Sequence, residues 1–303
     1  KENGDSMKQI LIFIWVGSLF SQVAVDTTKK LPIFDLSKGF NIPGIIPKNI
    51  PMTNQFILFP HEIEAIKQKA RDYNPEIVTT DDIVLMETNR GTMKLKLFSD
   101  VAPKHCRNFK KLANSGYYDK TAFHRIIPGF MIQGGDINSR DNDPKNDGLG
   151  GPGWTVDAEF NDISHKRGVL SMARSKDPNS AGSQFFICVA DSPHLDGDYT
   201  AFGEVIENVH VADHIVKTPT EYMQAKRMSK ENIPDGEDPD NWITLRDIKT
   251  GKKLYSKVPQ FKKKADYEYE MRNKMNSDRP SLPLTIVKLR VLKESEVQDI
   301  QAE

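Results

Sequence analysis

Residues 123–136 read FHRIIPGFMIQGGD, and this stretch decides the fold. The Pro128-Gly129 pair predicts a tight turn between two short strands, 122–127 and 130–133. In that hairpin Arg125, Phe130, Met131 and Gln133 could project near one another. An Arg with five fixed donors, beside two apolar side chains and an amide, suits recognition of a carbonyl-bearing apolar ligand. The other interpretation is a surface Arg above ordinary core residues, and spacing alone gives both equal weight.

The sequence around this hairpin alternates between short strands and a few helices. Apolar residues two apart predict strands at 83–88, 92–98, 169–173, 184–189, 200–206 and 284–292. Helical spacing predicts helices at 61–73, 101–115 and 209–217, with Phe109 and Leu112 on one face of the second. Many short strands with few helices indicate a mostly antiparallel β-barrel or sandwich.

Four blocks of the sequence, in register, resemble the cyclophilin family of peptidyl-prolyl cis-trans isomerases. Besides 123–136, they are Ala173-Arg174 with 182–187 (GSQFFI), then 195–197 (LDG) and 201–205 (AFGEV). The resemblance covers about half of the chain. It implies a mostly β fold, a closed eight-stranded antiparallel barrel with two capping helices. We expect this barrel at 81–219, completed by a last strand at 284–293.

The resemblance also implies roles for individual residues. Arg125 would be the catalytic residue. The proline pocket would contain Phe130, Met131, Phe186 and Leu195, with the hydroxyl of Tyr199 at its edge. The substrate main chain would bind Gln133, Gln184 and the backbone of Ala173 and Arg174. Phe185 should face the core, opposite to Phe186, whereas Phe202 could line the pocket or belong to the core. His194 stands where the best-known eukaryotic members carry Trp, which leaves cyclosporin sensitivity open.

The implied activity is isomerisation of X-Pro bonds in unfolded or exposed protein segments, with no metal and no cofactor. The expected partners are therefore proline-containing polypeptides. An alternative function is a peptide-binding or chaperone module that uses the same groove and docks a partner through residues 220–283. We expect a monomer.

The N-terminal residues are typical of a targeting segment. From Met7, one Lys precedes an 11-residue apolar run from Ile10 to Phe20, which is too short to span a bilayer and suits a signal peptide. We therefore expect a signal-peptide region at 1–24 and export to the periplasm or the outside; an uncleaved anchor is the alternative. A Pro-rich extension with a short helix is expected at 25–80.

The charge balance limits the partners. The 303 residues contain 42 Lys and Arg against 42 Asp and Glu, which argues against nucleic acid as the main partner. The balance is uneven, because an insertion at 220–283 has 14 basic against 11 acidic residues and could bind an envelope protein. We expect it to pack without an independent core, and a polar tail at 294–303. Cys106 and Cys188 are expected to be separate buried thiols.

Overall fold

The computed structural model describes residues 58–141 and 143–302. All described residues belong to one compact unit. The signal-peptide region predicted at 1–24 and most of the extension predicted at 25–80 lie outside the described residues. The extension's short helix is described, and forms α1 (Pro60–Asp72).

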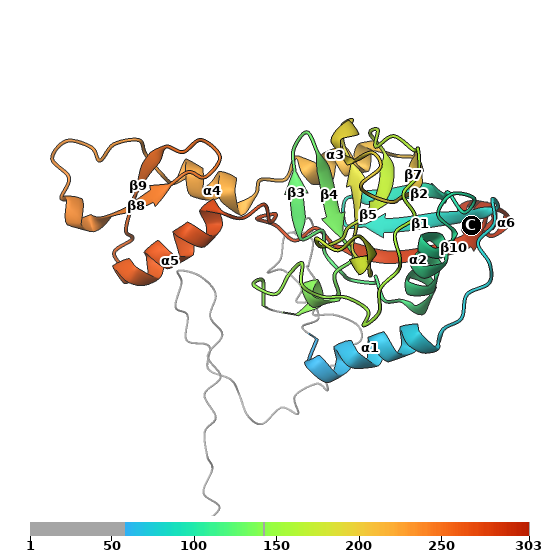
Figure 1. Ribbon diagram of the computed structural model, residues 1–303. Coiled ribbons are helices and arrows are strands. Elements are labelled where there is room, and N and C mark those ends of the chain that lie inside the picture. The colour runs from blue at the N-terminus through green and yellow to red at the C-terminus, as the bar shows by residue number, and fades with distance from the viewer. Residues whose placement is uncertain (1–57, 142, 303) are drawn as a thin grey trace, which may run out of the picture. The chain divides into compact units, whose positions relative to one another are not determined.

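One sheet of eight strands forms the main part of the fold, and every pairing in it is antiparallel (Figure 1). Its order is β10-β1-β2-β7-β5-β6-β4-β3. The strands are β1 (Asp82–Thr88), β2 (Gly91–Leu97), β3 (Arg125–Ile127), β4 (Met131–Gly134), β5 (Val169–Met172), β6 (Phe185–Cys188), β7 (Ala201–Glu207) and β10 (Ile286–Lys293). The predicted mostly β fold with eight antiparallel strands is therefore confirmed.

The two edge strands of this sheet, β3 and β10, are joined by hydrogen bonds between the residues just before β3 and those at the start of β10. Phe123 N donates to Leu284 O at 2.8 Å, and Ile286 N donates to Thr121 O at 2.8 Å. The ladders between described strands include no β3–β10 pair, so full closure of the barrel stays a prediction.

Two helices pack on the sheet, α2 (Pro103–Ser115) and α3 (His210–Val216). Phe109 and Leu112 of α2 are fully buried, as their spacing predicted. The ring of Phe109 lies 5.3 Å from Tyr118, 5.5 Å from Phe185 and 5.2 Å from Phe202, measured between centroids. This aromatic group connects α2 with β6 and β7 and belongs to the largest cluster of buried apolar side chains in the described part of the chain, the main core.

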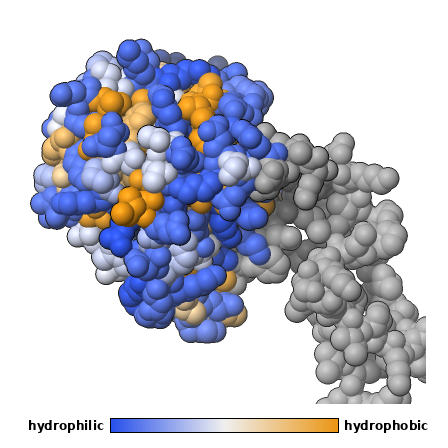
Figure 2. Space-filling model, turned by 90° about the vertical axis from the view of Figure 1, so that its right-hand side faces the viewer, coloured by the Kyte–Doolittle hydropathy of each residue, from blue (hydrophilic) through white to orange (hydrophobic). Residues whose placement is uncertain are grey.

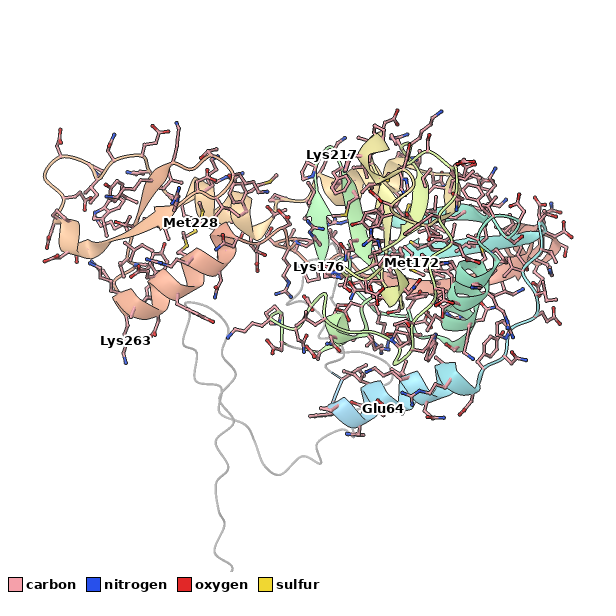
Figure 3. The ribbon with its side chains drawn as sticks, in the orientation of Figure 1. Glu64, Met172, Lys176, Lys217, Met228 and Lys263 are labelled. Atoms are coloured by element: carbon pink, nitrogen blue, oxygen red, sulfur yellow. The ribbon has the colours of Figure 1, made fainter. Side chains whose placement is uncertain are left out.

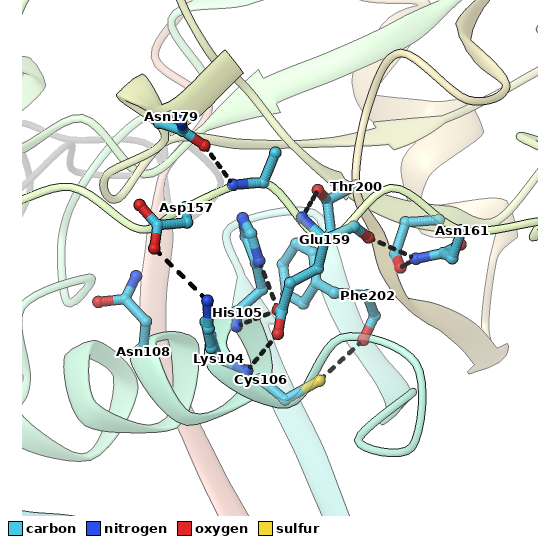
Figure 4. A network of polar contacts seen from close by, with 12 residues as sticks. Lys104, His105, Cys106, Asn108, Asp157, Glu159, Asn161, Asn179, Thr200 and Phe202 are labelled. Carbon is cyan, nitrogen blue, oxygen red and sulfur yellow. Dashed lines mark hydrogen bonds and ion pairs between the residues drawn. The ribbon is translucent and has the colours of Figure 1, made fainter.

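The N-terminus of α2 is capped from a distant loop (Figure 4). Ala102 stands at the N-cap position and provides no side-chain hydrogen bond. The Glu159 carboxylate accepts instead from the backbone N–H of Lys104 at 3.0 Å and of His105 at 2.9 Å. A carboxylate at this position satisfies free N–H groups and interacts favourably with the helix dipole. Glu159 therefore fixes α2 to the loop that precedes β5.

The insertion predicted at 220–283 is a packed substructure. It contains α4 (Glu221–Arg227), β8 (Trp242–Arg246), β9 (Lys253–Lys257) and α5 (Lys264–Met275), with β8 and β9 paired as a separate antiparallel sheet. Figure 3 labels Met228 and Lys263 in this part, and Met172 and Lys217 in the part that contains the eight-stranded sheet. The buried side chains of the insertion form a cluster of their own: Tyr222, Ala225, Ile243, Leu245, Leu254, Tyr267, Met271 and Met275.

This cluster corrects the expectation that the insertion lacks an independent core. Half of its members are Tyr and Met residues of the two helices, Tyr222, Tyr267, Met271 and Met275. Other apolar residues of the insertion, such as Ile248 and Phe261, are exposed.

The two ends of the insertion meet. Thr220 and Pro280 form an antiparallel bridge. Glu221 N donates to Arg279 O at 2.9 Å, and Ser281 N donates to Pro219 O at 2.8 Å. The insertion therefore leaves and rejoins the rest of the chain at one place.

The remaining elements are short or terminal. The residues predicted as a polar tail form α6 (Glu294–Ala302), whose Val297 is buried. Single 3₁₀ turns occur at Ile137–Arg140, Pro178–Ser180, Pro193–Leu195 and Pro239–Asn241. On the face shown in Figure 2, polar residues predominate and apolar ones form small separate patches. No helix within residues 58–141 and 143–302 has the length and apolar character needed to cross a membrane.

Candidate active site

The register of four neighbouring strands brings distant motif residues into one row. Arg125 of β3 lies opposite Gln133 of β4, Gln133 lies opposite Phe186 of β6, and Phe186 lies opposite Ser171 of β5. Residues directly opposite each other in paired strands point to the same face of a sheet. Met131 precedes Gln133 by two residues and shares this face. The strand register therefore places three predicted site residues, Arg125, Gln133 and Phe186, side by side.

The predicted turn between these strands is present. Phe130 N donates to Ile127 O at 3.0 Å, and Gly129 has a φ of 75°. Such a positive φ is easy only for glycine. The Pro128-Gly129 turn thus fixes the pairing of β3 with β4, and with it the place of Arg125 beside Gln133.

A second apolar cluster lies on this face, apart from the main core, and we call it the apolar site cluster. Its buried members are Met131, Phe186, Cys188 and Leu195, and its partly buried members are Ile127, Phe130, Ala173 and Tyr199. Six of these eight residues were predicted as site residues from the sequence. The structure therefore brings together the whole predicted pocket, and it adds Ile127 and Cys188.

The polar site residues form a chain of hydrogen bonds beside the cluster. Arg125 Nη1 donates to Gln133 Oε1 at 3.4 Å, and Gln133 Nε2 donates to Gln184 Oε1 at 3.1 Å. Gln184 Nε2 in turn donates to the carbonyls of Gly148 and Gly150, both at 2.9 Å. Gln184 thus orients Gln133 and anchors the loop that contains Gly148 and Gly150. The Arg125 side chain is 46% exposed, so its guanidinium can reach a bound ligand.

Arg174 and Tyr199 form one edge of the site. The Arg174 guanidinium lies 4.6 Å from the centre of the Tyr199 ring, and its Nε donates to Asp198 O at 3.0 Å. The N–H of Ala173 donates to Gln184 O at 2.9 Å. That N–H is therefore engaged within the sheet, and a substrate main chain would have to use the other backbone groups of this segment.

The ring of His165 packs against Phe186, a contact that the sequence did not indicate. The buried ring stacks on Phe186 with centroids 6.1 Å apart. Its two nitrogens lie 2.9 Å from Asp196 Oδ1 and 2.9 Å from Ser171 Oγ. His165 stands outside every motif block, so only the position of Asp196 in the LDG block hinted at this contact.

His194 contacts the apolar site cluster from the protein surface. It is exposed, and its ring centroid lies 5.3 Å from that of Phe130. His194, which departs from the best-known eukaryotic members, thus contacts the apolar site cluster through Phe130.

Phe185 and Phe202 belong to the main core, and both are fully buried there. The prediction for Phe185 is confirmed, and the open choice for Phe202 is decided in favour of the core. Cys106 and Cys188 are free and buried, as expected. Burial raises the pKa of each thiol to about 12, so neither is a nucleophile at neutral pH.

Asp147, in the loop that Gln184 anchors, gives the region a pH dependence. Burial raises the pKa of its carboxyl to about 6, although Arg279 Nε lies 3.3 Å away and opposes the shift. The raised pKa means that the folded state holds this proton more tightly than the unfolded state does. The protonated Asp147 carboxyl therefore stabilises the folded state. This contribution is complete below about pH 4 and is lost as the pH rises through about 6.

Asp147→Asn is therefore expected to gain stability relative to wild type as the pH rises from 4 to 7. The gain should be on the order of 2 kcal/mol, because one pKa unit corresponds to about 1.4 kcal/mol. Urea unfolding at several pH values measures it, with Asp162→Asn at an exposed position as the control. If the free energies of unfolding of Asp147→Asn and wild type differ by the same amount at every pH in this range, the expectation is contradicted.

Comparison with known proteins identifies the family. Residues 83–234 match the family model described as cyclophilin type peptidyl-prolyl cis-trans isomerase/CLD. The matched range includes the first part of the insertion predicted at 220–283. A peptidyl-prolyl cis-trans isomerase of Synechococcus elongatus is 48% identical over 120 residues, covering 40% of this chain and 77% of the relative. One of Arabidopsis thaliana is 49% identical over 144 residues, covering 45% of this chain and 84% of the relative.

Among solved structures, a cyclophilin-type peptidyl-prolyl cis-trans isomerase of Cryptosporidium parvum, crystallised with the dipeptide Ala-Pro, is similar at 29% identity. It covers 70% of this chain and 99% of that one, with a TM-score of 0.47. The family match spans half of the present chain, and the two relatives are matched over more than two thirds of their own length. The chain belongs to the cyclophilin family and is a peptidyl-prolyl cis-trans isomerase.

Proposed function

We propose that this isomerase acts on X-Pro bonds in unfolded or exposed protein segments, with Arg125 as the catalytic residue. One observation carries the proposal: the half-exposed guanidinium of Arg125 lies in the same row as Gln133 and Phe186, beside the apolar site cluster. In this arrangement the apolar surface can bind a proline ring, while the cation faces the amide bond that precedes the ring.

The mechanism follows from the physics of the amide bond. Resonance gives the X-Pro bond a rotational barrier of about 18 to 20 kcal/mol, and the twisted transition state has lost that resonance. The prolyl nitrogen then becomes pyramidal and regains its lone pair. The Arg125 guanidinium can donate to that lone pair, which neither planar isomer offers. Binding the transition state more tightly than either ground state lowers the barrier.

The other site residues would hold the substrate while the bond rotates. The proline ring would lie on the apolar site cluster, against Phe186 and Leu195. Gln133, Gln184 and the backbone of Ala173 and Arg174 would bind the flanking main chain. Rotation about the bond breaks no covalent bond and transfers no proton or electron, so these groups suffice for the reaction.

Phe186→Ala tests the pocket. Removal of the ring should raise KM for a short Ala-Pro peptide by about fivefold to thirtyfold, because it removes about 1 to 2 kcal/mol of apolar contact with the proline. NMR exchange spectroscopy on both isomers measures kcat and KM directly. Phe261→Ala is the matched control, since Phe261, in the insertion, is 86% exposed. Equal KM values for Phe186→Ala and wild type would refute this pocket.

Three wider proposals rest on the sequence. They are export to the periplasm or the outside, action as a monomer, and docking of an envelope protein through residues 220–283. Mass spectrometry of the mature N-terminus from fractionated cells tests export, because cleavage near residue 24 would remove the predicted signal peptide. The alternative of a peptide-binding chaperone module gains support only if partner capture survives in an Arg125 variant that no longer catalyses isomerisation.

A further inference from the structure

The return segment of the insertion passes directly beside the proposed catalytic residue. After α5 ends at Met275, the chain runs toward β10, and the carbonyl of Asp278 accepts a hydrogen bond from Ile126 N at 2.9 Å. Ile126 follows Arg125 on β3. This backbone bond therefore fixes Asp278 next to Arg125, although the two residues are far apart in the sequence.

The side chain of Asp278 faces the guanidinium. Asp278 Oδ2 lies 3.6 Å from Arg125 Nε, whereas Gln133 Oε1 accepts from Nη1 of the same guanidinium. The Asp278 side chain is 24% exposed and the Arg125 side chain 46%. The guanidinium is thus held at two of its nitrogens by two different groups, one from the sheet and one from the insertion.

Asp278 is itself held by the packed part of the insertion. Its Oδ1 accepts from Lys249 Nζ at 2.9 Å, and that ammonium lies 4.3 Å from the centre of the Tyr222 ring. Tyr222 belongs to the buried cluster of the insertion. A continuous series of contacts therefore runs from this cluster through Lys249 and Asp278 to Arg125.

We propose that Asp278 is a positioning residue for Arg125, and that the insertion completes the active site through it. The proposal rests on the proposed catalytic role of Arg125. An Arg side chain on a surface has several rotatable bonds and loses considerable entropy when it is fixed. Contacts at Nε and Nη1 restrict this motion before the substrate binds, so less is lost in the transition state.

Lys249 also keeps the site electropositive. A carboxylate beside Arg125 would weaken the attraction of the guanidinium for the lone pair of the prolyl nitrogen. Lys249 on the other carboxylate oxygen offsets that effect, because the group of Arg125, Asp278 and Lys249 retains one net positive charge. Asp278 can therefore orient the guanidinium without neutralising the site.

The test compares variants with an uncharged X-Pro peptide in NMR exchange spectroscopy. Asp278→Asn should lower kcat about twofold to fivefold at unchanged KM, the effect expected for a partly exposed ion pair that acts in the transition state. Asp278→Glu should recover part of the lost kcat, and Lys249→Ala should lower kcat less than Asp278→Asn. Glu231→Gln removes the same charge from an exposed pair of the insertion and should leave kcat unchanged.

Salt distinguishes positioning from a merely structural role. Raising NaCl from about 0.05 to 1 M screens exposed ion pairs, so wild-type kcat should fall toward the Asp278→Asn value, whereas kcat of Asp278→Asn should stay constant. A flat salt profile for wild type, or equal kcat for Asp278→Asn and wild type, would overturn the inference. Arg125→Ala in the same assay separates the two proposals: full activity of Arg125→Ala refutes the proposed function, whereas loss of its activity with an unaffected Asp278→Asn refutes only the role of Asp278.

Discussion

Arg125→Ala is expected to lower kcat/KM for an X-Pro peptide by about 10²-fold to 10³-fold, the loss typical when one preorganised donor to a transition state is removed. Most of the loss should fall on kcat, because the guanidinium bonds strongly only to the pyramidal nitrogen of the twisted state. Arg125→Lys should be intermediate. It keeps the charge but loses the planar array of donors that Gln133 and Asp278 hold at two points.

Two controls make this result interpretable. Arg167→Ala removes an exposed Arg that pairs with Asp213 and was not predicted as a site residue, and it should leave kcat/KM unchanged. Circular dichroism should show that Arg125→Ala folds normally, since its side chain is half-exposed. A folded Arg125→Ala with wild-type kcat/KM would show that the rate acceleration has another source.

Phe109→Ala should produce the largest loss of stability, about 3 to 5 kcal/mol in the free energy of unfolding. The ring is fully buried and contacts Tyr118, Phe185 and Phe202 at once. Its removal leaves a cavity at the joint between α2 and the sheet. Because Phe185 precedes Phe186 on β6, the loosened core should also reduce activity at temperatures well below the unfolding midpoint.

Hydrogen exchange with mass spectrometry measures this effect and provides an internal control. Exchange should accelerate in β6, β7 and α2, but not in β8, β9 and α5, because the insertion has its own buried cluster. Phe261→Ala, at an exposed position, should change neither region. A loss below about 1 kcal/mol for Phe109→Ala would mean that the core closes over the cavity.

The sequence was sufficient for the sheet because strand alternation is a local pattern, whereas the members of the pocket were implied by the family resemblance. Alternation over a few residues marks strands, and the Pro128-Gly129 turn sets the register that aligns Arg125 with Gln133. Once the family resemblance added the GSQFFI block, the place of Phe186 in the row followed from strand alternation. The residues predicted for the pocket accordingly fall into one cluster.

The insertion could not be predicted in the same way. Helix α5 is dominated by charged residues, and only Tyr267, Met271 and Met275 of it are buried. Ion pairs such as Arg272–Glu268 cover its other side, so no broad apolar face marks the helix in the sequence.

The contact between Arg125 and Asp278 could not be predicted from the sequence for a different reason. It joins residues separated by four strands of the sheet and most of the insertion, and neither side chain lies in a pattern that predicts its partner. The same holds for His165, whose partners Ser171 and Asp196 come together only when β5 and the loop before β7 are in place. Contacts of this kind depend on the tertiary fold alone.

The pairing of β10 with β1 has a consequence for how the protein is made. During synthesis β1 emerges about 200 residues before its partner, so one side of β1 lacks its strand until almost all of the described chain has left the ribosome. Non-local pairings of this kind slow folding and leave an edge open to aggregation. Early folding of the insertion would reduce this delay. Since its ends meet at Thr220 and Pro280, a folded insertion shortens the path between β7 and β10 from a long flexible loop to a short connection.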